Sequence, residues 1–293
     1  MRRLRGAALV TALAAVLALV GCSPVASVDP DIEVSGEPGA APTITYVTPI
    51  VVTDTFTDQI WPGTGDELVE GGPVLIDFWL ENGQNAELVK ESYSSNPTPR
   101  MLTEEALGTD LYHALKGQKV GARVLQVSPA SDTTPGSYPT VTVIDVLPTR
   151  AAGEAQPPRA DLPAVALDDS GAPTITATGT AAPSELVAQP LIRGAGPQVG
   201  AEDVITVQYS GFAWDTGELF DSTWSRTLPV SFSLQDVPAW AAGLVEQPVG
   251  SQIMLVIPPS YSLGVTESEE LAGQTVVFVV DLLATGAPEG SES

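Results

Sequence analysis

The chain has 293 residues with 12 Lys and Arg, 36 Asp and Glu, and a formal net charge of -24. Such acidity repels nucleic acid, which we therefore exclude as an expected partner. One Cys and one His allow neither an internal disulfide nor a Cys/His metal cluster, and we expect no catalytic role for His113. The length predicts two domains, and 27 Gly with 26 Pro favour β structure rich in turns.

Residues 1–21 have the features of a secretory signal peptide. Several arginines precede an apolar run from Ala7 to Val20, which is shorter than the ~20 residues of a membrane-spanning helix. Leu19-Val20-Gly21-Cys22 resembles the bacterial lipobox, and the resemblance implies cleavage before Cys22 and a diacylglyceryl thioether on its sulfur. The alternative is an ordinary signal peptide with a chance cysteine. We expect a chain anchored to the membrane by the lipid on Cys22, at the extracytoplasmic face.

After the predicted signal peptide, residues 22–40 are rich in Pro, Gly, Ser and acidic types without periodicity. They are interpreted as a disordered, lipid-anchored tether. Farther along, the spacing of Leu111 and Leu115 predicts a short helix over residues 110–116, and Asp110 is a candidate N-cap.

The second half of the chain begins with a predicted linker over residues 151–161, which contains prolines and has little hydrophobicity. Short β-branched runs at 204–209 and 253–257 then alternate with Gly and Pro turns, as is typical of strands. Between them, a second short helix is predicted over 238–245 because its apolar side chains share one face.

An internal repeat links the two halves. Ala41-Pro42-Thr43-Ile44-Thr45 recurs unchanged from Ala172, an offset of 131 residues (172 minus 41). Three further matches follow in the same order: Gly63–Gly65 with Gly194–Gly196, Val120-Gly121 with Val249-Gly250, and Val143–Leu147 with Val279–Leu283. Ordered matches at nearly constant spacing indicate a duplicated domain. We predict a first domain over 41–150, a second over 162–285 and a tail over 286–293.

The second repeat resembles the FKBP-type peptidyl-prolyl cis-trans isomerases over nearly its whole length. Each motif is weak alone, but their order and spacing together are specific. The motifs are Val207–Gly211, Asp215–Ser222, Arg226, Val237–Trp240, Gly243-Leu244, Pro248–Gly250, Ile257–Gly264 and Val277–Leu283. The resemblance implies an α+β, mostly β fold: two tandem FKBP-like domains, each an antiparallel sheet wrapped around a short helix.

The resemblance also implies a proline-binding aromatic cup without a metal or other cofactor. Trp240 is its expected floor, and the expected walls are Tyr209, Phe220, Phe278, Val237 and Val230. Asp221 and Arg226 match a polar pair at the rim, and Tyr261 matches an accessory ring. Asp221 is expected to act electrostatically on the twisted amide or to orient Tyr209; both roles remain open. For any one aromatic residue, the alternative is a plain core position.

The second repeat departs from the family pattern at Leu263, where a tyrosine commonly donates a hydrogen bond to the bound carbonyl. Loss of one such hydrogen bond costs about 1–3 kcal/mol, unless Tyr261 substitutes for the donor. The hairpin at 265–274 is shorter than usual, and Glu267, Glu269 and Glu270 are interpreted as a solvated loop that disfavours acidic clients.

The first repeat departs further. Phe78 matches Tyr209, but the Phe-Asp pair is placed near Ala86-Glu87, Leu111 stands at the Trp240 position and Thr142 at the Phe278 position. We interpret this repeat as a degenerate domain that serves structure or partner binding.

The leading functional hypothesis is an extracytoplasmic prolyl isomerase whose clients are proline-containing exported polypeptides. A catalytically weak binding or chaperone scaffold is the alternative, and Leu263 favours it. A solute-binding lipoprotein is a third class, which the repeat argues against. The sequence does not predict an oligomeric state.

Overall fold

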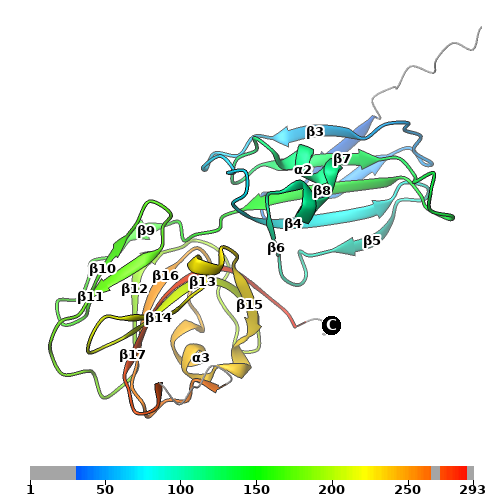
Figure 1. Cartoon of the computed structure of the whole chain (residues 1–293). Helices are drawn as coiled ribbons and strands as arrows, with labels where there is room; N and C mark the ends of the chain where they lie inside the picture. Colours follow the sequence, from blue (N-terminus) through cyan, green and yellow to red (C-terminus); the bar gives the residue numbers. More distant parts are fainter. Residues whose placement is uncertain (1–30, 265–270, 289–293) are drawn as a thin grey trace, which may run out of the picture.

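A computed structural model describes residues 31–264 and 271–288. The predicted signal peptide, Cys22 and the three glutamates of the 265–274 hairpin lie outside these residues. Two antiparallel sheets, one from each repeat, lie side by side and are joined by the segment that follows β8 (Thr140–Leu147) (Figure 1). No helix in the described part of the chain has the length and apolar character needed to cross a membrane.

The first sheet has six strands. In spatial order they are β3 (Phe56–Trp61), β7 (Arg123–Ser128), β8, β4 (Pro73–Asn82) and β5 (Glu87–Glu91), with β6 (Thr98–Met101) paired to the first half of β4. Two short helices, α1 (Glu104–Leu107) and α2 (Thr109–Leu115), follow β6. The buried residues Tyr112 and Leu115 of α2 pack with Val74, Ile76 and Ile144 on one face of this sheet.

The second sheet has seven strands. In spatial order they are β14 (Leu219–Ser222), β13 (Val204–Ala213), β17 (Val276–Gly286), β16 (Gln252–Ile257), β12 (Val187–Arg193) and β9 (Glu154–Ala155), with β15 (Val230–Ser233) paired to β13. Two 3-10 turns, η1 (Trp224–Arg226) and η2 (Leu234–Asp236), precede α3 (Pro238–Leu244). Figure 1 shows α3 lying against the sheet.

The two sheets have the same strand order. β5-β4-β8-β7-β3 of the first corresponds to β14-β13-β17-β16-β12 of the second, and β6 and β15 pair with corresponding central strands. Positions at the same place in corresponding strands are called matching positions below. The predicted architecture, mostly β with two tandem domains that each hold a short helix against an antiparallel sheet, is confirmed, and the first domain has one further short helix, α1.

Side chains alternate between the two faces of each sheet, and apolar side chains on both faces pack against other elements. In the second domain, Val207, Phe278 and Val280 point toward α3, where they pack with Trp240 and Leu244. On the other face, a separate cluster includes Phe212, Met254 and Val277, and it packs against Val165 and Ile175 of the hairpin β10 (Ala164–Leu167) and β11 (Pro173–Thr176). The hairpin β1 (Ile32–Ser35) and β2 (Thr43–Tyr46) covers the first sheet in the same way.

The expected boundaries need three corrections. Residues 32–35 of the predicted tether form β1. Pairing with β2 and packing of Ile32 and Val34 stabilise this strand, which the local composition does not predict. Within the predicted linker, β9 pairs with the end of β12. The last strand, β17, extends one residue into the predicted tail, to Gly286.

The predicted helix over 110–116 is α2, but its expected cap is wrong. Gly108 is the N-cap residue and makes no side-chain capping hydrogen bond. Asp110 lies in the first turn, where Oδ2 accepts a hydrogen bond of 2.7 Å from the Thr55 hydroxyl of the segment before β3. The carboxylate therefore joins the helix to its neighbouring strand region and still lies at the favourable positive end of the helix.

Candidate active site

Trp240 lies at the centre of an aromatic cluster in the second domain. It is the third residue of α3, which begins with Pro238, a residue whose fixed φ suits the first helical turn. Its side chain is only 2% exposed. The ring centroid of Trp240 lies 5.2 Å from that of Tyr209 and 5.1 Å from that of Phe278, both in edge-to-face geometry. These separations are those of favourable aromatic pairs.

Gly211 allows the walls of this cluster to come together. It lies directly opposite Phe278 in the pairing of β13 with β17, and opposite Asp221 in the pairing with β14. A Cβ atom at Gly211 would lie 2.7 Å from a ring atom of Phe220 and 2.8 Å from one of Phe278, closer than side chains tolerate. Glycine therefore leaves room for Phe220 and Phe278 to pack edge to face, with centroids 5.6 Å apart.

The cluster is open at one end. The floor ring, Trp240, and the wall ring of Phe278 are buried, Tyr209 is half-buried and Phe220 is 37% exposed. An apolar ring that entered from solvent would meet Phe220 first and Trp240 last. We call this set of residues the aromatic cup.

Three polar side chains form a network at the rim of the cup. The Tyr209 hydroxyl donates a hydrogen bond of 2.5 Å to Oδ2 of Asp221, and Arg226 donates one of 2.6 Å to Oδ1. A second Arg226 nitrogen lies 3.3 Å from the Tyr209 oxygen and donates to it. The network holds the phenol of Tyr209 in place while its ring faces Trp240.

Partial burial is the largest single influence on the pKa of Asp221 and acts to raise it. Hydrogen bonds from Tyr209 and Arg226 together outweigh this effect, so the pKa is lowered below its ordinary value. Burial, followed by the hydrogen bond to Asp221, raises the pKa of Tyr209 to about 12. At neutral pH the cup therefore presents a carboxylate and an intact phenol.

The remaining predicted residues also lie at or near the cup. Val237 is buried as the N-cap residue of α3, and Val230 is partly buried on β15. Leu263 is buried in the same cluster, and Tyr261 packs against it while donating a hydrogen bond of 3.0 Å to Glu185. The structure thus brings together all the aromatic and polar residues predicted for this site.

Two further residues support the cup and were missed from sequence. The Phe232 ring lies 5.3 Å from that of Trp240, and the alternation along β15 could have indicated that it shares a face with Val230. The Thr223 hydroxyl accepts a hydrogen bond of 2.8 Å from the backbone N–H of Tyr209, which ties the end of β14 to β13. No local pattern indicates the role of Thr223.

The matching region of the first domain has lost the cup. Leu111 lies at the position of Trp240 in its helix, and Thr142 lies at the position of Phe278, because Thr142 pairs with Leu80 as Phe278 pairs with Gly211. His113 is exposed on α2, with its ring against Tyr112.

The predicted match of the Phe-Asp pair to Ala86-Glu87 is wrong. Leu80 pairs with Lys90 in the first sheet as Gly211 pairs with Asp221 in the second. The Ser92 hydroxyl also accepts from the Phe78 N–H, as Thr223 does from Tyr209. The match of Phe220-Asp221 is therefore Val89-Lys90, so the rim carboxylate is replaced by a cation.

The chemistry available at the cup is non-covalent. It can bury a small apolar ring between aromatic faces and place an amide beside a fixed carboxylate and phenol. No group of three or more His, Cys, Asp or Glu side chains capable of holding a metal ion occurs in residues 31–264 and 271–288.

Comparison with known proteins agrees with this geometry. A family model described as FKBP-type peptidyl-prolyl cis-trans isomerase matches residues 196–283, a range that includes all four aromatic residues of the cup, Tyr209, Phe220, Trp240 and Phe278. A probable FK506-binding protein of Corynebacterium glutamicum is 36% identical over 105 residues, 35% of this chain and 89% of that protein. An FK506-binding protein of Streptomyces anulatus is 32% identical over 118 residues, 38% of this chain and 95% of that protein.

Among solved structures, the crystal structure of FkpA from Escherichia coli is 34% identical in sequence, with a TM-score of 0.33, and the match covers 38% of this chain and 53% of that one. The two relatives above are covered over nearly their whole length at more than 30% identity. This chain belongs to the FKBP-type peptidyl-prolyl cis-trans isomerase family.

Proposed function

We propose that the aromatic cup of the second domain is the isomerase active site. The observation that carries the proposal is the joint placement of Trp240, Tyr209 and Phe278 within 6 Å of one another, beside the carboxylate of Asp221. In the first domain the matching helix residue is Leu111, which offers no such floor.

The proposed chemistry needs no nucleophile. Rotation about a peptide bond has a barrier of about 18–20 kcal/mol because the planar amide has partial double-bond character. X-Pro bonds populate both isomers and exchange over tens to hundreds of seconds without a catalyst. A site that stabilises the twisted amide more than either planar isomer accelerates exchange.

The cup supplies this preference by excluding water. A twisted amide is less polar than a planar one, so a pyrrolidine ring and its amide lose less hydration energy in the twisted form when aromatic walls surround them. Asp221 holds Tyr209 in position and places negative charge beside the rotating bond. Arg226 keeps that carboxylate ionised and oriented.

We further propose that the protein acts outside the cytoplasm, on proline-containing exported polypeptides. The lipobox-like Leu19-Val20-Gly21-Cys22 supports this placement, with a lipid on Cys22 as the membrane anchor. Residues 23–31 would then connect the lipid to β1, a shorter tether than composition suggested.

A catalytically weak binding scaffold is the second candidate, and one observation favours it. Leu263 brings no hydroxyl to the site, and the hydroxyl hydrogen of Tyr261 is already donated to Glu185. Replacement of the missing donor by Tyr261 therefore requires that this hydrogen bond be broken.

An exchange of matching residues tests the proposal. Phe278→Thr introduces the residue that the first domain carries at this position, and it should lower the rate of cis-to-trans relaxation of an X-Pro peptide by the full chain at least about tenfold. Thr142→Ala, in the matching position of the first domain, is the control and should leave the rate unchanged. Circular dichroism establishes that both variants are folded. Equal losses in the two variants would place the activity elsewhere, and no activity in the folded wild-type chain would favour the scaffold.

A further inference from the structure

The first domain has a buried arginine on the face of its sheet that is turned away from α2. Arg123 is fully buried, and its Nε and Nη2 donate hydrogen bonds of 2.6 Å to the two carboxylate oxygens of Asp145, directly opposite on β8. The guanidinium lies 4.6 Å from the ring centroid of Trp61 and also donates to the backbone oxygen of Ala40 at 2.7 Å. Asp77 of β4, the neighbouring strand on the other side of β8, lies directly opposite Asp145.

The second domain keeps the carboxylate of this arrangement but lacks the arginine. Asp281 matches Asp145, and Gln252 matches Arg123, because each pair lies directly opposite in corresponding strands. Ile192 matches Trp61 and Gln208 matches Asp77 by the same register. A buried carboxylate is therefore conserved between the repeats while its guanidinium partner is replaced by a neutral amide.

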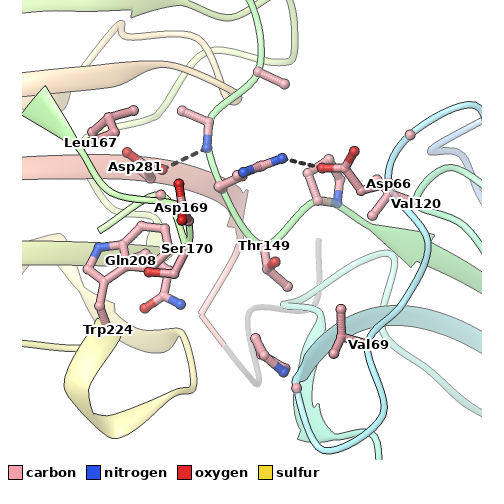
Figure 2. A pocket seen from close by; sticks show the side chains of 18 of the residues that line it. Asp66, Val69, Val120, Thr149, Leu167, Asp169, Ser170, Gln208, Trp224 and Asp281 are labelled. Atoms are coloured by element: carbon pink, nitrogen blue, oxygen red, sulfur yellow. Dashed lines mark hydrogen bonds and ion pairs between the residues drawn. The ribbon is translucent and has the colours of Figure 1, made fainter. Parts of the chain in front are cut away.

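A cleft of about 940 Å³ opens above these residues, between the two domains. Figure 2 shows Asp281, Gln208 and Trp224 on the second-domain side, and Asp66, Val69 and Val120 on the first-domain side. The turn of the β10–β11 hairpin, residues 168–171, closes one side of the cleft, as the β1–β2 turn covers Arg123 in the first domain.

The floor of the cleft has unused capacity to accept hydrogen bonds. Gln208 is 1% exposed, and its Oε1 has no donor among the described residues. Each oxygen of Asp281 accepts one hydrogen bond, from Gln252 Nε2 at 2.7 Å and from the Ala151 N–H at 2.8 Å. A carboxylate can accept about four, so acceptor sites remain on Asp281 as well.

The charge of the cleft is negative. Its lining includes several acidic residues, among them Asp281, Asp168, Asp169 and Glu67. The basic residue in the lining, Arg150, forms an ion pair with Asp66. A cation that enters would meet buried acceptors at the floor, carboxylates at the rim and the face of Trp224.

We propose that this cleft binds an arginine side chain of a second polypeptide, whose guanidinium lies beside Gln252 against the remaining acceptor sites of Asp281, as the Arg123 guanidinium lies against Asp145 in the first domain. The planar guanidinium carries five N–H donors in a fixed fork, which suits a carboxylate flanked by a carbonyl acceptor better than the point charge of lysine does. The cleft is larger than one guanidinium and extends to the first domain, so it has room for the chain that carries the arginine. The inference is independent of the isomerase proposal, because Gln208 and Tyr209 point to opposite faces of β13.

A titration of the full chain with short peptides that contain no proline tests this inference. We expect acetyl-Gly-Gly-Arg-Gly-Gly-amide to shift the side-chain amide resonances of Gln208 and Gln252 in nitrogen-15 NMR spectra. The same peptide with citrulline, which has the shape of arginine without its charge, should bind at least about tenfold more weakly. Equal affinity of the two peptides, or no shifts at millimolar arginine peptide, would overturn the inference. If free arginine amide binds as tightly as the arginine peptide, the proposal that the ligand is a polypeptide is wrong.

Two variants locate the site. Gln252→Arg introduces the residue of the first domain, should fill the cleft from within and should abolish peptide binding while isomerase activity is retained. Asp169→Asn, on the exposed hairpin turn, should weaken binding several-fold and provides the test if Gln252→Arg does not fold. If both variants fold and still bind the arginine peptide as tightly as the wild type, the cleft is not its binding site. If Gln252→Arg does not fold, undiminished binding by Asp169→Asn alone leads to the same conclusion.

Discussion

The Tyr209 hydroxyl donates a 2.5 Å hydrogen bond to Asp221, and the two residues come from strands that lie side by side, β13 and β14. This bond fixes the Tyr209 ring edge to face with Trp240. Because Arg226 binds the same carboxylate, the charge at the rim is held in one place rather than distributed over several side-chain rotamers. The predictions about catalysis follow from this network and from the cup beneath it.

Loss of the Asp221 carboxylate should slow the isomerase without unfolding it. In Asp221→Ala, Tyr209 loses its acceptor and Arg226 loses its ion-pair partner, so we expect the rate to fall about tenfold or more. Asp221→Asn keeps a hydrogen-bond acceptor without the charge, so its rate should lie between those of the wild type and Asp221→Ala. The measurement is cis-to-trans relaxation of an X-Pro peptide; wild-type rates in both variants would show that the carboxylate has no part in the reaction.

The rate should be nearly independent of pH from roughly pH 5 to pH 9. The pKa of Asp221 is lowered, so it remains a carboxylate over this range, and the pKa of Tyr209 is raised to about 12, so it remains protonated. A pH profile of the relaxation rate, with a peptide that does not itself titrate, checks this expectation. A step near neutral pH would mean that another titrating group controls the reaction.

Introduction of the missing hydroxyl at residue 263 should strengthen substrate binding. Leu263→Tyr supplies a donor that does not depend on the Tyr261–Glu185 hydrogen bond, and one such bond corresponds to roughly a tenfold gain in affinity. Leu263→Phe adds the ring without the hydroxyl and is the control. If the two variants have the same Michaelis constant for a proline peptide, the absent hydroxyl does not limit binding.

Asp281 should make the stability of the second domain depend on pH. Burial raises its pKa to about 6, against the hydrogen bonds from Ala151 and Gln252 and the charge of Arg150, whereas the unfolded chain releases this proton near 3.8. Between these values the folded state binds more protons, so the free energy of unfolding falls as pH rises from about 4 to 6. The loss is on the order of 3 kcal/mol, since one pKa unit corresponds to about 1.4 kcal/mol.

The change to asparagine isolates this contribution. Asp281→Asn cannot titrate, so its free energy of unfolding relative to the wild type should rise between pH 4 and pH 7 in denaturant titrations. A difference between variant and wild type that stays constant over this range would show that Asp281 has the same pKa in both states.

Most of the fold and the cup could be predicted from the sequence, by two different routes. The repeat of Ala41–Thr45 from Ala172 indicated duplication, whereas the cup residues Trp240 and Phe278 were implied by motifs whose order resembles that of the FKBP-type isomerases. Strand β1 could not be predicted, because Ile32 and Val34 alternate over only four residues and are stabilised by packing on a distant sheet.

The register in which the strands pair could not be predicted from the sequence either. Lys90, rather than Glu87, matches Asp221, and only the pairing of Leu80 with Lys90 shows it. The cleft depends on positions brought together from separate strands, so the relation of Gln252 to Arg123 becomes visible only when both sheets are aligned.

The catalytic role of the cup is tested by the rate of cis-to-trans relaxation of an X-Pro peptide with the full chain and with its Trp240→Leu variant, which carries at the cup floor the residue of the first domain. We expect a clear acceleration by the wild-type chain and a rate near the uncatalysed one with the folded variant. Equal acceleration by both proteins would contradict a catalytic cup built on Trp240.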